Sequence, residues 1–502
     1  MPICIAHPHL NDQKNRDILP SDDPNLLVGS CDGDAAEVVP ATLRAPESPS
    51  SRMAQLKHWT GMDRAIAFTI LARFWQGMAG FITVLLIARF LTLSEQGYYY
   101  TFSSLVALQI VFELGFSFVV LQLAAHERAQ LTFLPDGQIQ GTAVSHSRLA
   151  SILQKSIRWY SVAGLLMAFA LIFAGFHFFE AHQTDGVSVA WKIPWCLLVI
   201  AAMLAFQIDP IFSFLEGCGY ITEVARRRFS QAVVGSILAW IAIATKHGLY
   251  APALVILGQV LVGMAFLFSF RLRRLLKNLL FYPVGEHFVG WRREIWPFQW
   301  RIAISWMSGY FIFQIFNPVL FAYQGPTAAG RMGMSLSIAS SVGSVAIAWM
   351  NTKASPFGNL IARGEIAALD TLFFRTLWQS TLLLTAGTVV IFGSLLIVSH
   401  SFPEYATRVL PPWVFALLLL TTIISHIVFS EALYLRAHKC EPFLWQSVSV
   451  AILVGCTTFL LGKSMGANAV TVSYFLLGGL LSLAWGTYIF RTKRREWHGV
   501  RR

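Results

Sequence analysis

The chain has 502 residues, of which 55% are hydrophobic and only 13% are charged, and its formal net charge is +12. A soluble protein of this length would have to bury more apolar surface than its core could hold, so the composition indicates an integral membrane protein. The six cysteines are scattered without metal-ligand spacing. This argues against a disulfide or zinc framework.

The first 62 residues differ from the rest of the chain. They are an aperiodic mixture rich in Pro, Asp, Ser and Asn, with no apolar run long enough for a signal peptide. Such a segment cannot bury enough apolar surface to fold alone. We therefore expect a disordered cytoplasmic tail over residues 1–62.

Apolar runs of membrane-spanning length recur from Arg64 onward, and a window of roughly 20 residues finds twelve of them. They lie near residues 66–90, 98–122, 158–179, 191–214, 229–246, 250–270, 299–321, 328–350, 376–399, 409–433, 443–462 and 469–490. A basic cytoplasmic connector (271–298) separates the first six (63–270) from the last six (299–490), and a basic tail (491–502) follows. The sequence therefore predicts an all-α polytopic membrane protein with twelve transmembrane helices in two six-helix lobes.

The basic residues predict the orientation. If the N-terminus is cytoplasmic, 31 of the 38 Lys and Arg residues fall in inner segments, Arg226, Arg227 and Arg228 among them, and five fall in outer segments. Positively charged loops remain on the cytoplasmic side of a membrane. We therefore expect both termini to be cytoplasmic and the net charge to reflect inner-leaflet anchors, with no nucleic-acid partner.

The loops carry no signal for an enzyme. The outer segments are short, and the chain lacks a Gly-rich phosphate loop, a Ser/His/Asp set and a paired-carboxylate motif. A membrane-embedded glycan-assembly enzyme would need a sizeable loop around its substrate, so we expect a transporter and not an enzyme.

One inner segment, residues 145–160, has an amphipathic pattern. It places Leu149, Ile152, Leu153 and Ile157 on one helical face, with basic residues elsewhere. This pattern is typical of a helix lying in the membrane interface.

The two halves of the chain look related. The segment TLSEQGYY (92–99), interpreted as a tight turn over Thr92–Gly97 and the start of the second span, aligns with residues around 326–333. Gly97 then corresponds to Gly330. Two repeated bundles related by a pseudo-symmetry axis are a common transporter architecture, and in that architecture the substrate path lies between the two halves.

Four segments carry a family resemblance: ARFLTLSEQGYYYTF, ELGFSFVVLQ, FLEGCGYITEVARRRFSQAVVG and SPFGNLIARGE. In this order they resemble the polysaccharide/O-antigen (lipid-linked oligosaccharide) flippases of the multidrug/oligosaccharidyl-lipid/polysaccharide exporter superfamily. The acidic tail and the long 123–156 connector depart from that pattern.

The resemblance implies an inverted-V bundle in the bacterial inner membrane that moves a polyprenyl-diphosphate-linked oligosaccharide to the outer leaflet by alternating access. The partners it implies are this lipid-linked oligosaccharide, membrane lipids and other polysaccharide-assembly proteins. A multidrug or organic-cation exporter of the same superfamily is the alternative.

Polar residues within the spans are the candidates for binding such a substrate, because a diphosphate needs cations and a glycan needs hydrogen-bonding groups across about 30 Å of hydrocarbon. They are Arg73 and Gln76 in the first span, Tyr310, Gln314 and Asn317 in the seventh, and Arg331 near the outer end of the eighth. Arg73 would either line a cavity and bind phosphate, or reach the inner headgroups or an acid. Outer headgroups could satisfy Arg331 instead.

Two carboxylates, Glu113 in the second span and Asp209 in the fourth, lie inside apolar runs. One interpretation is a structural ion pair, with Glu113 facing Arg73 on the adjacent span. The other is coupling of transport to H+ or Na+. No cofactor or metal site is expected.

Overall fold

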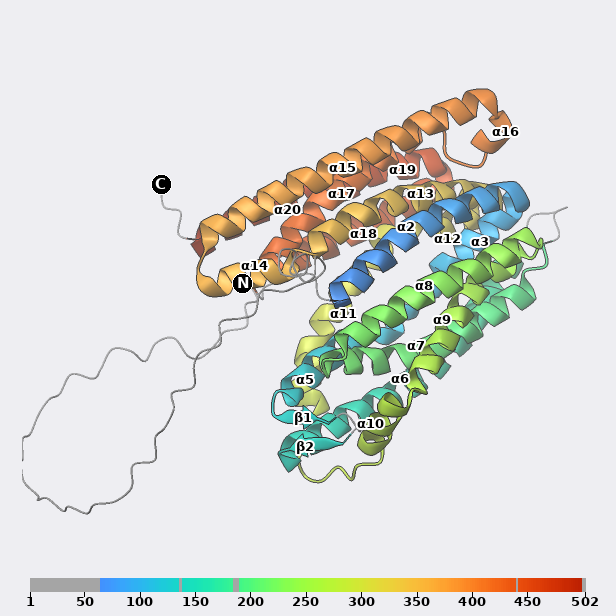
Figure 1. The fold of residues 1–502 in the computed structure, drawn as a ribbon. Helices are drawn as coiled ribbons and strands as arrows, with labels where there is room; N and C mark the ends of the chain where they lie inside the picture. Colours follow the sequence, from blue (N-terminus) through green and yellow to red (C-terminus); the bar gives the residue numbers. More distant parts are fainter. Residues whose placement is uncertain (1–63, 135–137, 184–188, 439–440, 499–502) are drawn as a thin grey trace, which may run out of the picture.

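The computed structural model describes residues 64–134, 138–183, 189–438 and 441–498, and these are helical almost throughout (Figure 1). The predicted tail over residues 1–62 lies outside this part of the chain, as do the last four residues.

The first lobe is a bundle of helices with one short hairpin. Its helices are α2 (Arg64–Phe90), α3 (Leu93–Val106), α4 (Gln109–Glu113), α5 (Phe116–Arg128), α6 (Ala143–Ala181), α7 (Lys192–Gly217), α8 (Ile221–Ala244) and α9 (Ala251–Leu267), with a 3-10 turn at Gly248–Tyr250. Between α5 and α6, strands β1 (Leu131–Phe133) and β2 (Ile139–Gly141) pair antiparallel, with Leu131 opposite Gly141. The sequence did not predict this hairpin. Helix α10 (Phe270–Leu280) leads out of the lobe.

The second lobe begins with a π-helical turn at Trp291–Ile295. Its helices are α11 (Trp296–Phe313), α12 (Phe316–Gln324), α13 (Pro326–Asn351), α14 (Ala354–Arg363), α15 (Ile366–Ser401), α16 (Pro403–Ala406), α17 (Pro412–Arg436), α18 (Leu444–Ser464), α19 (Ala467–Tyr474) and α20 (Ser482–His498), with a π-helical segment at Phe475–Leu481.

All twelve predicted stretches are helical. In the described part of the chain, nine helices are long and apolar enough to cross a membrane, or up to eleven if each of two bent helix pairs is one span. The bends are 46° between Leu93–Glu113 and Phe116–Arg128, and 41° between Ile302–Phe313 and Phe316–Gln324. Helix α8, which starts with a charged segment, is not among these spans; it packs between α2 and α9.

The predicted turn at Thr92–Gly97 is wrong, because most of it is the first turn of α3. The Thr92 hydroxyl accepts a hydrogen bond from the Glu95 N–H, and the Glu95 carboxylate accepts one from the Thr92 N–H at 2.8 Å. This reciprocal capping box is a helix-start signal. Only Leu91 and Thr92 therefore separate α2 from α3.

The predicted interfacial helix is also wrong. Helix α6 runs unbroken from Ala143, and Leu149, Ile152 and Leu153 are buried in the core of the first lobe. The connector docks on this part of α6 through the Val289 N–H, which donates to the Ser151 hydroxyl at 3.1 Å, and through Lys155, which donates to the Val289 carbonyl. The connector therefore belongs structurally to the first lobe.

The two lobes touch where α3 crosses α13. A Cβ at Gly97 would overlap the Pro326 carbonyl, and a Cβ at Gly330 would lie 2.9 Å from the Gly97 nitrogen. The buried Gln96 amide donates to the carbonyls of Gly330 at 2.8 Å and Arg408 at 2.9 Å. Gly97 and Gly330, aligned between the two halves by sequence, thus lie against each other.

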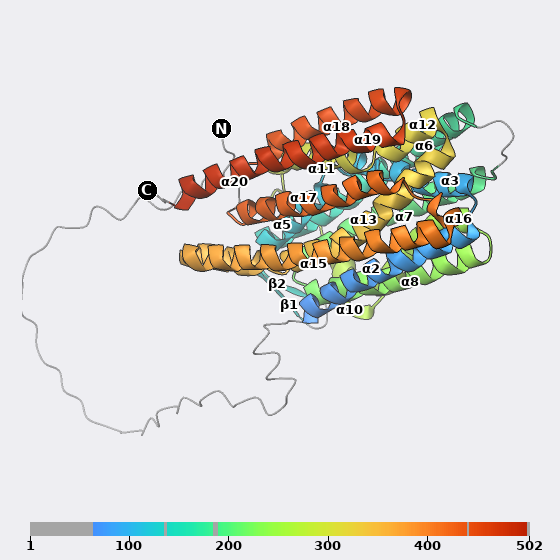
Figure 2. The same ribbon diagram turned by 90° about the horizontal axis from the view of Figure 1, so that it is seen from above.

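From this contact the lobes diverge toward the end of the molecule that carries α10, α14 and the hairpin (Figure 1). Helix α2 begins and helix α20 ends toward this end (Figure 1), which is the predicted cytoplasmic side. Helix α2 packs against α8 of its own lobe and also against α13 of the other, so it lies along the junction (Figure 2).

Candidate transport site

Arg73 is an exposed cation on α2. Its guanidinium Nη1 lies 3.3 Å from the Gln76 Oε1, one turn along the same face. No carboxylate in the described part of the chain lies within ion-pair distance of Arg73. The expected pair with Glu113 is therefore not formed, and Arg73 can accept an external anion.

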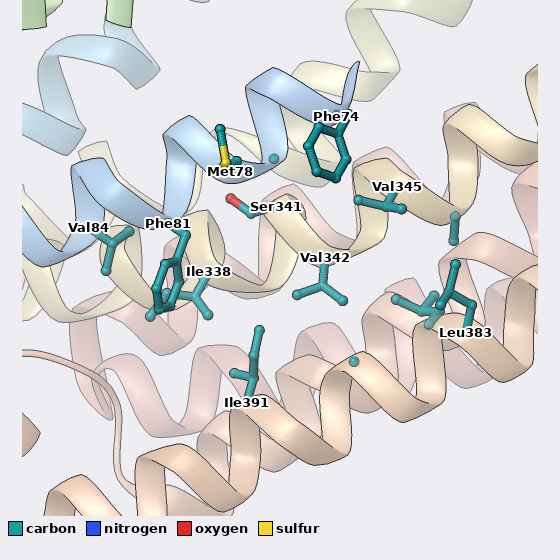
Figure 3. Close-up of a pocket in the computed structure, with 14 residues that line it drawn as sticks. Phe74, Met78, Phe81, Val84, Ile338, Ser341, Val342, Val345, Leu383 and Ile391 are labelled. Carbon is teal, nitrogen blue, oxygen red and sulfur yellow. The ribbon is translucent and has the colours of Figure 1, made fainter. Parts of the chain in front are cut away.

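An apolar groove adjoins Arg73. A cavity of about 460 Å³ lies between α2, α13 and α15, and Phe74, Met78 and Phe81 project into it from α2 (Figure 3). Its opposite walls are formed by residues such as Val342 and Leu383. Helices α2 and α13 approach closely here, since a Cβ at Gly80 would lie 2.7 Å from the Ser341 hydroxyl.

The arrangement on α2 suits an amphiphile. Phe74 follows Arg73 directly in the sequence and is 64% exposed. The residues lining the groove recur at helical spacing from Phe74 to Val84, over about 15 Å of helix. The guanidinium of Arg73 thus lies beside a groove lined by apolar side chains. Such a site can bind an anionic headgroup and the apolar chain attached to it at the same time.

Gln314 and Asn317 lie at the bend between α11 and α12. The Asn317 Nδ2 donates to the Ser104 hydroxyl at 3.0 Å, and that hydroxyl donates to the Gln314 Oε1 at 3.4 Å. Tyr310, one turn earlier, is buried. Two of the three predicted sugar ligands are thus bonded to α3 of the first lobe in this conformation.

Arg331 lies far from Arg73. It follows Gly330 at the α3–α13 contact, and its Nε donates to the Thr407 carbonyl at 2.7 Å. Arg73 is about 25 Å from the end of α2 that leads into this contact. The structure therefore does not bring the two predicted cations together.

Glu113 ends α4 at a break that the sequence did not predict. Leu114 and Gly115 adopt left-handed backbone angles, with φ of 51° and 65°. The Ser117 hydroxyl donates to the Glu113 Oε1 at 2.5 Å and lies 2.7 Å from the Tyr160 hydroxyl. Glycine in the left-handed conformation is a common helix-ending signal, so the Leu114–Gly115 pair could have indicated this break.

Asp209 does form an ion pair, and its partner corrects the role expected of one basic residue. The Asp209 Oδ1 lies 2.8 Å from the Arg227 Nη2, and Arg227 is only 4% exposed. The Arg227 guanidinium also lies 3.5 Å from the centroid of the Phe212 ring. Arg227 is therefore a buried cation of the first lobe and not an inner-leaflet anchor.

We expect Asp209→Asn to lower the thermal midpoint of the purified protein. A buried cation that loses its partner is costly, but the Asp209 side chain is 60% exposed, so we expect a loss of about 1–2 kcal/mol. Glu216→Gln, which breaks the pair with the exposed Arg228, is the control and should shift the midpoint less, because an exposed cation keeps its water when its partner is lost. Equal shifts would contradict a special role for the Arg227 pair.

Sequence reasoning missed an ion-pair cluster at the predicted cytoplasmic end. Arg148 on α6 lies 2.7 Å from the Glu127 carboxylate and 2.5 Å from that of Glu294 in the π-helical turn. Partial burial raises the pKa of the Glu294 carboxyl, but Arg148 and the Gly290 N–H more than offset this and hold the pKa below its usual range. The cluster ties the entry of the second lobe to the first.

No protein-family model matches the chain, and no curated protein matches it. Its fold is similar to that of the lipid II flippase MurJ in an inward closed conformation, with a TM-score of 0.56, 14% identity, and coverage of 85% of this chain and 89% of MurJ.

Two MATE transporters also match. An inward-facing multidrug resistance MATE transporter of the MOP superfamily has a TM-score of 0.51 at 14% identity, covering 84% of this chain and 99% of its own. The eukaryotic MATE transporter AtDTX14 has a TM-score of 0.52 at 14% identity, covering 88% and 99%. At such identities the likeness shows the fold alone: the chain is a multi-pass membrane protein whose two-lobed fold is similar to that of these transporters.

Proposed function

We propose that the protein is a flippase that moves a polyprenyl-diphosphate-linked oligosaccharide from the cytoplasmic to the outer leaflet of a bacterial inner membrane, for surface or exopolysaccharide synthesis. The observation that carries the proposal is the position of Arg73, exposed and without an acidic partner in the described residues, beside the apolar groove of α2, α13 and α15.

The chemistry of this substrate fits that position. An arginine within a span costs about 3 kcal/mol or more unless an anion or water satisfies it. A diphosphate supplies oxygens for bidentate hydrogen bonds with the guanidinium, while the polyprenyl chain can occupy the groove. The similarity in fold to a lipid II flippase supports the same class of substrate.

A multidrug exporter is the second candidate, favoured by the MATE-like fold and by carboxylates in the first lobe. A cationic drug would need one of these carboxylates to be accessible. Glu113 is engaged by Ser117, and Asp209 is paired with Arg227. Arg73, in contrast, would repel a cation.

The two functions can be separated in proteoliposomes. Purified protein is reconstituted with fluorescent polyprenyl-diphosphate oligosaccharide in one set of vesicles and challenged with ethidium in another. We expect accelerated exchange of the lipid between leaflets and no gradient-driven ethidium transport. Ethidium transport without lipid exchange would overturn the flippase proposal in favour of the exporter.

We further propose that Glu113 couples transport to H+, since its carboxylate accepts a hydrogen bond from the Ser117 hydroxyl and is not paired with Arg73. Glu113→Gln should reduce lipid exchange driven by an imposed pH gradient by about tenfold, because the glutamine amide cannot bind and release a proton as a carboxylate does. Glu180→Gln, in an exposed pair with Lys192, is the control. Unchanged gradient-driven exchange, or a requirement for Na+ instead, would contradict proton coupling at Glu113.

A further inference from the structure

A second cavity lies against α11, a helix that is separate from α2 in the bundle (Figure 2). It has a volume of about 410 Å³ and is lined by Leu114 at the α4–α5 break and by α11 residues that include Trp296, Gln299 and Trp300. None of these residues belongs to the Arg73 groove.

Gln299 is the unusual member of this lining. It is 0% exposed, and within the described structure neither its amide nitrogen nor its amide oxygen has a hydrogen-bond partner. Buried amides almost always have partners, because an unpaired polar group in an apolar environment is costly. The free amide therefore indicates a partner that binds from outside the chain.

The backbone of the α4–α5 break, which packs against α11 near Gln299, has an unusual conformation. Leu114 has a φ of 51°, a conformation uncommon for a leucine, and Gly115 follows with a φ of 65°. A Cβ at Gly115 would overlap the Ile302 side chain. This break brings Leu114 against the cavity, at the junction between the lobes. Unusual backbone angles of this kind occur often at ligand sites.

The two tryptophans limit the kind of partner. Trp296 and Trp300 are four residues apart on α11, so they share a face of the helix, and Gln299 lies to one side of that face. A partner must offer a donor and an acceptor to the amide and an apolar face to an indole. Adjacent hydroxyls on a sugar ring meet the first need, and the C–H face of the ring meets the second.

We propose that the cavity at Gln299 is a saccharide subsite that recognises hydroxyl groups of the transported glycan. The inference rests on the proposed flippase function and deepens it, because it assigns sugar recognition to α11 and phosphate recognition to α2. A shift of the Gln299 side chain toward the cavity would accompany binding.

The test compares two probes in nanodiscs: a polyprenyl diphosphate without sugar, and the same lipid carrying one N-acetylhexosamine. Wild-type protein should bind the glycosylated lipid at least about tenfold more tightly, since a site built for hydroxyls discriminates against ligands that lack them. Gln299→Leu should abolish this preference while leaving affinity for the sugar-free lipid unchanged. Gln122→Leu, at an exposed position on α5, should retain the preference.

Stability gives a second measurement. Because Gln299→Leu removes an unpaired buried amide, its thermal midpoint without ligand should equal or exceed that of the wild type. A Gln299→Leu protein that keeps the preference for the glycosylated lipid overturns the subsite, as does equal binding of both probes by the wild type. Failure of the wild type to bind either probe would instead overturn the flippase proposal on which the subsite rests.

Discussion

Gly97→Ala is expected to destabilise the protein severely and to reduce its amount in the membrane. The added methyl group would overlap the Pro326 carbonyl, which is backbone and cannot rotate away. An extra methyl group in a well-packed core typically lowers the free energy of unfolding by about 1–3 kcal/mol when neighbouring side chains can move aside. The Pro326 backbone cannot move aside in this way, so the loss here should exceed that range. Thermal unfolding and size-exclusion profiles of a fluorescent fusion would measure both effects.

The matched control is Gly393→Ala on α15, where the added methyl group meets nothing within 4 Å. That variant should be neutral or gain about 0.5–1 kcal/mol, because alanine favours the helix over glycine. A Gly97→Ala protein as stable as the wild type would show that α3 and α13 do not pack as closely as described.

Arg73→Ala is expected to abolish lipid exchange while leaving the amount of protein in the membrane unchanged. Arg73 is exposed, and among the described residues its side chain bonds only to Gln76, so the fold loses little. If the guanidinium binds the diphosphate, its loss should reduce transport by about a hundredfold, the effect of about 3 kcal/mol in charged hydrogen bonds. Arg73→Lys keeps the positive charge but loses the planar set of guanidinium N–H donors that can bind two phosphate oxygens at once, so it should retain partial activity.

The control for Arg73 is Arg89→Ala. Arg89 is exposed in the last turn of the same helix, with its guanidinium 5.9 Å from the Phe90 ring centroid. Its replacement should leave exchange close to wild type. Full activity of Arg73→Ala at a normal membrane level would remove Arg73 from the transport site and leave the groove without a cation to bind the diphosphate.

The helices themselves could be predicted from the sequence, because each membrane span needs a run of about 20 apolar residues that is visible without knowledge of its neighbours. The bend at Leu114–Gly115 was missed because glycine is frequent in transmembrane helices and does not by itself interrupt an apolar run. The capping box at Thr92 and Glu95 was overlooked in the same way, as part of a polar turn.

The partners of the charged residues could be predicted less well. Arg226, Arg227 and Arg228 point about 100° apart around α8, and the residue that faces inward depends on how α8 is rotated against α2 and α9. That rotation is set by packing between helices. For the same reason, adjacency of the first two spans could not show that Glu113 faces Ser117 and Tyr160 instead of Arg73.

The docking of the connector on α6 determines how the lobes can move. Because residues up to Val289 are fastened to the first lobe, and Arg148 holds Glu294 as well, the chain has little slack between the lobes at this end. Any rocking of the second lobe must be absorbed within the few residues from Glu294 into α11. That short segment would then act as the hinge, and α11 would rotate about it together with the second lobe.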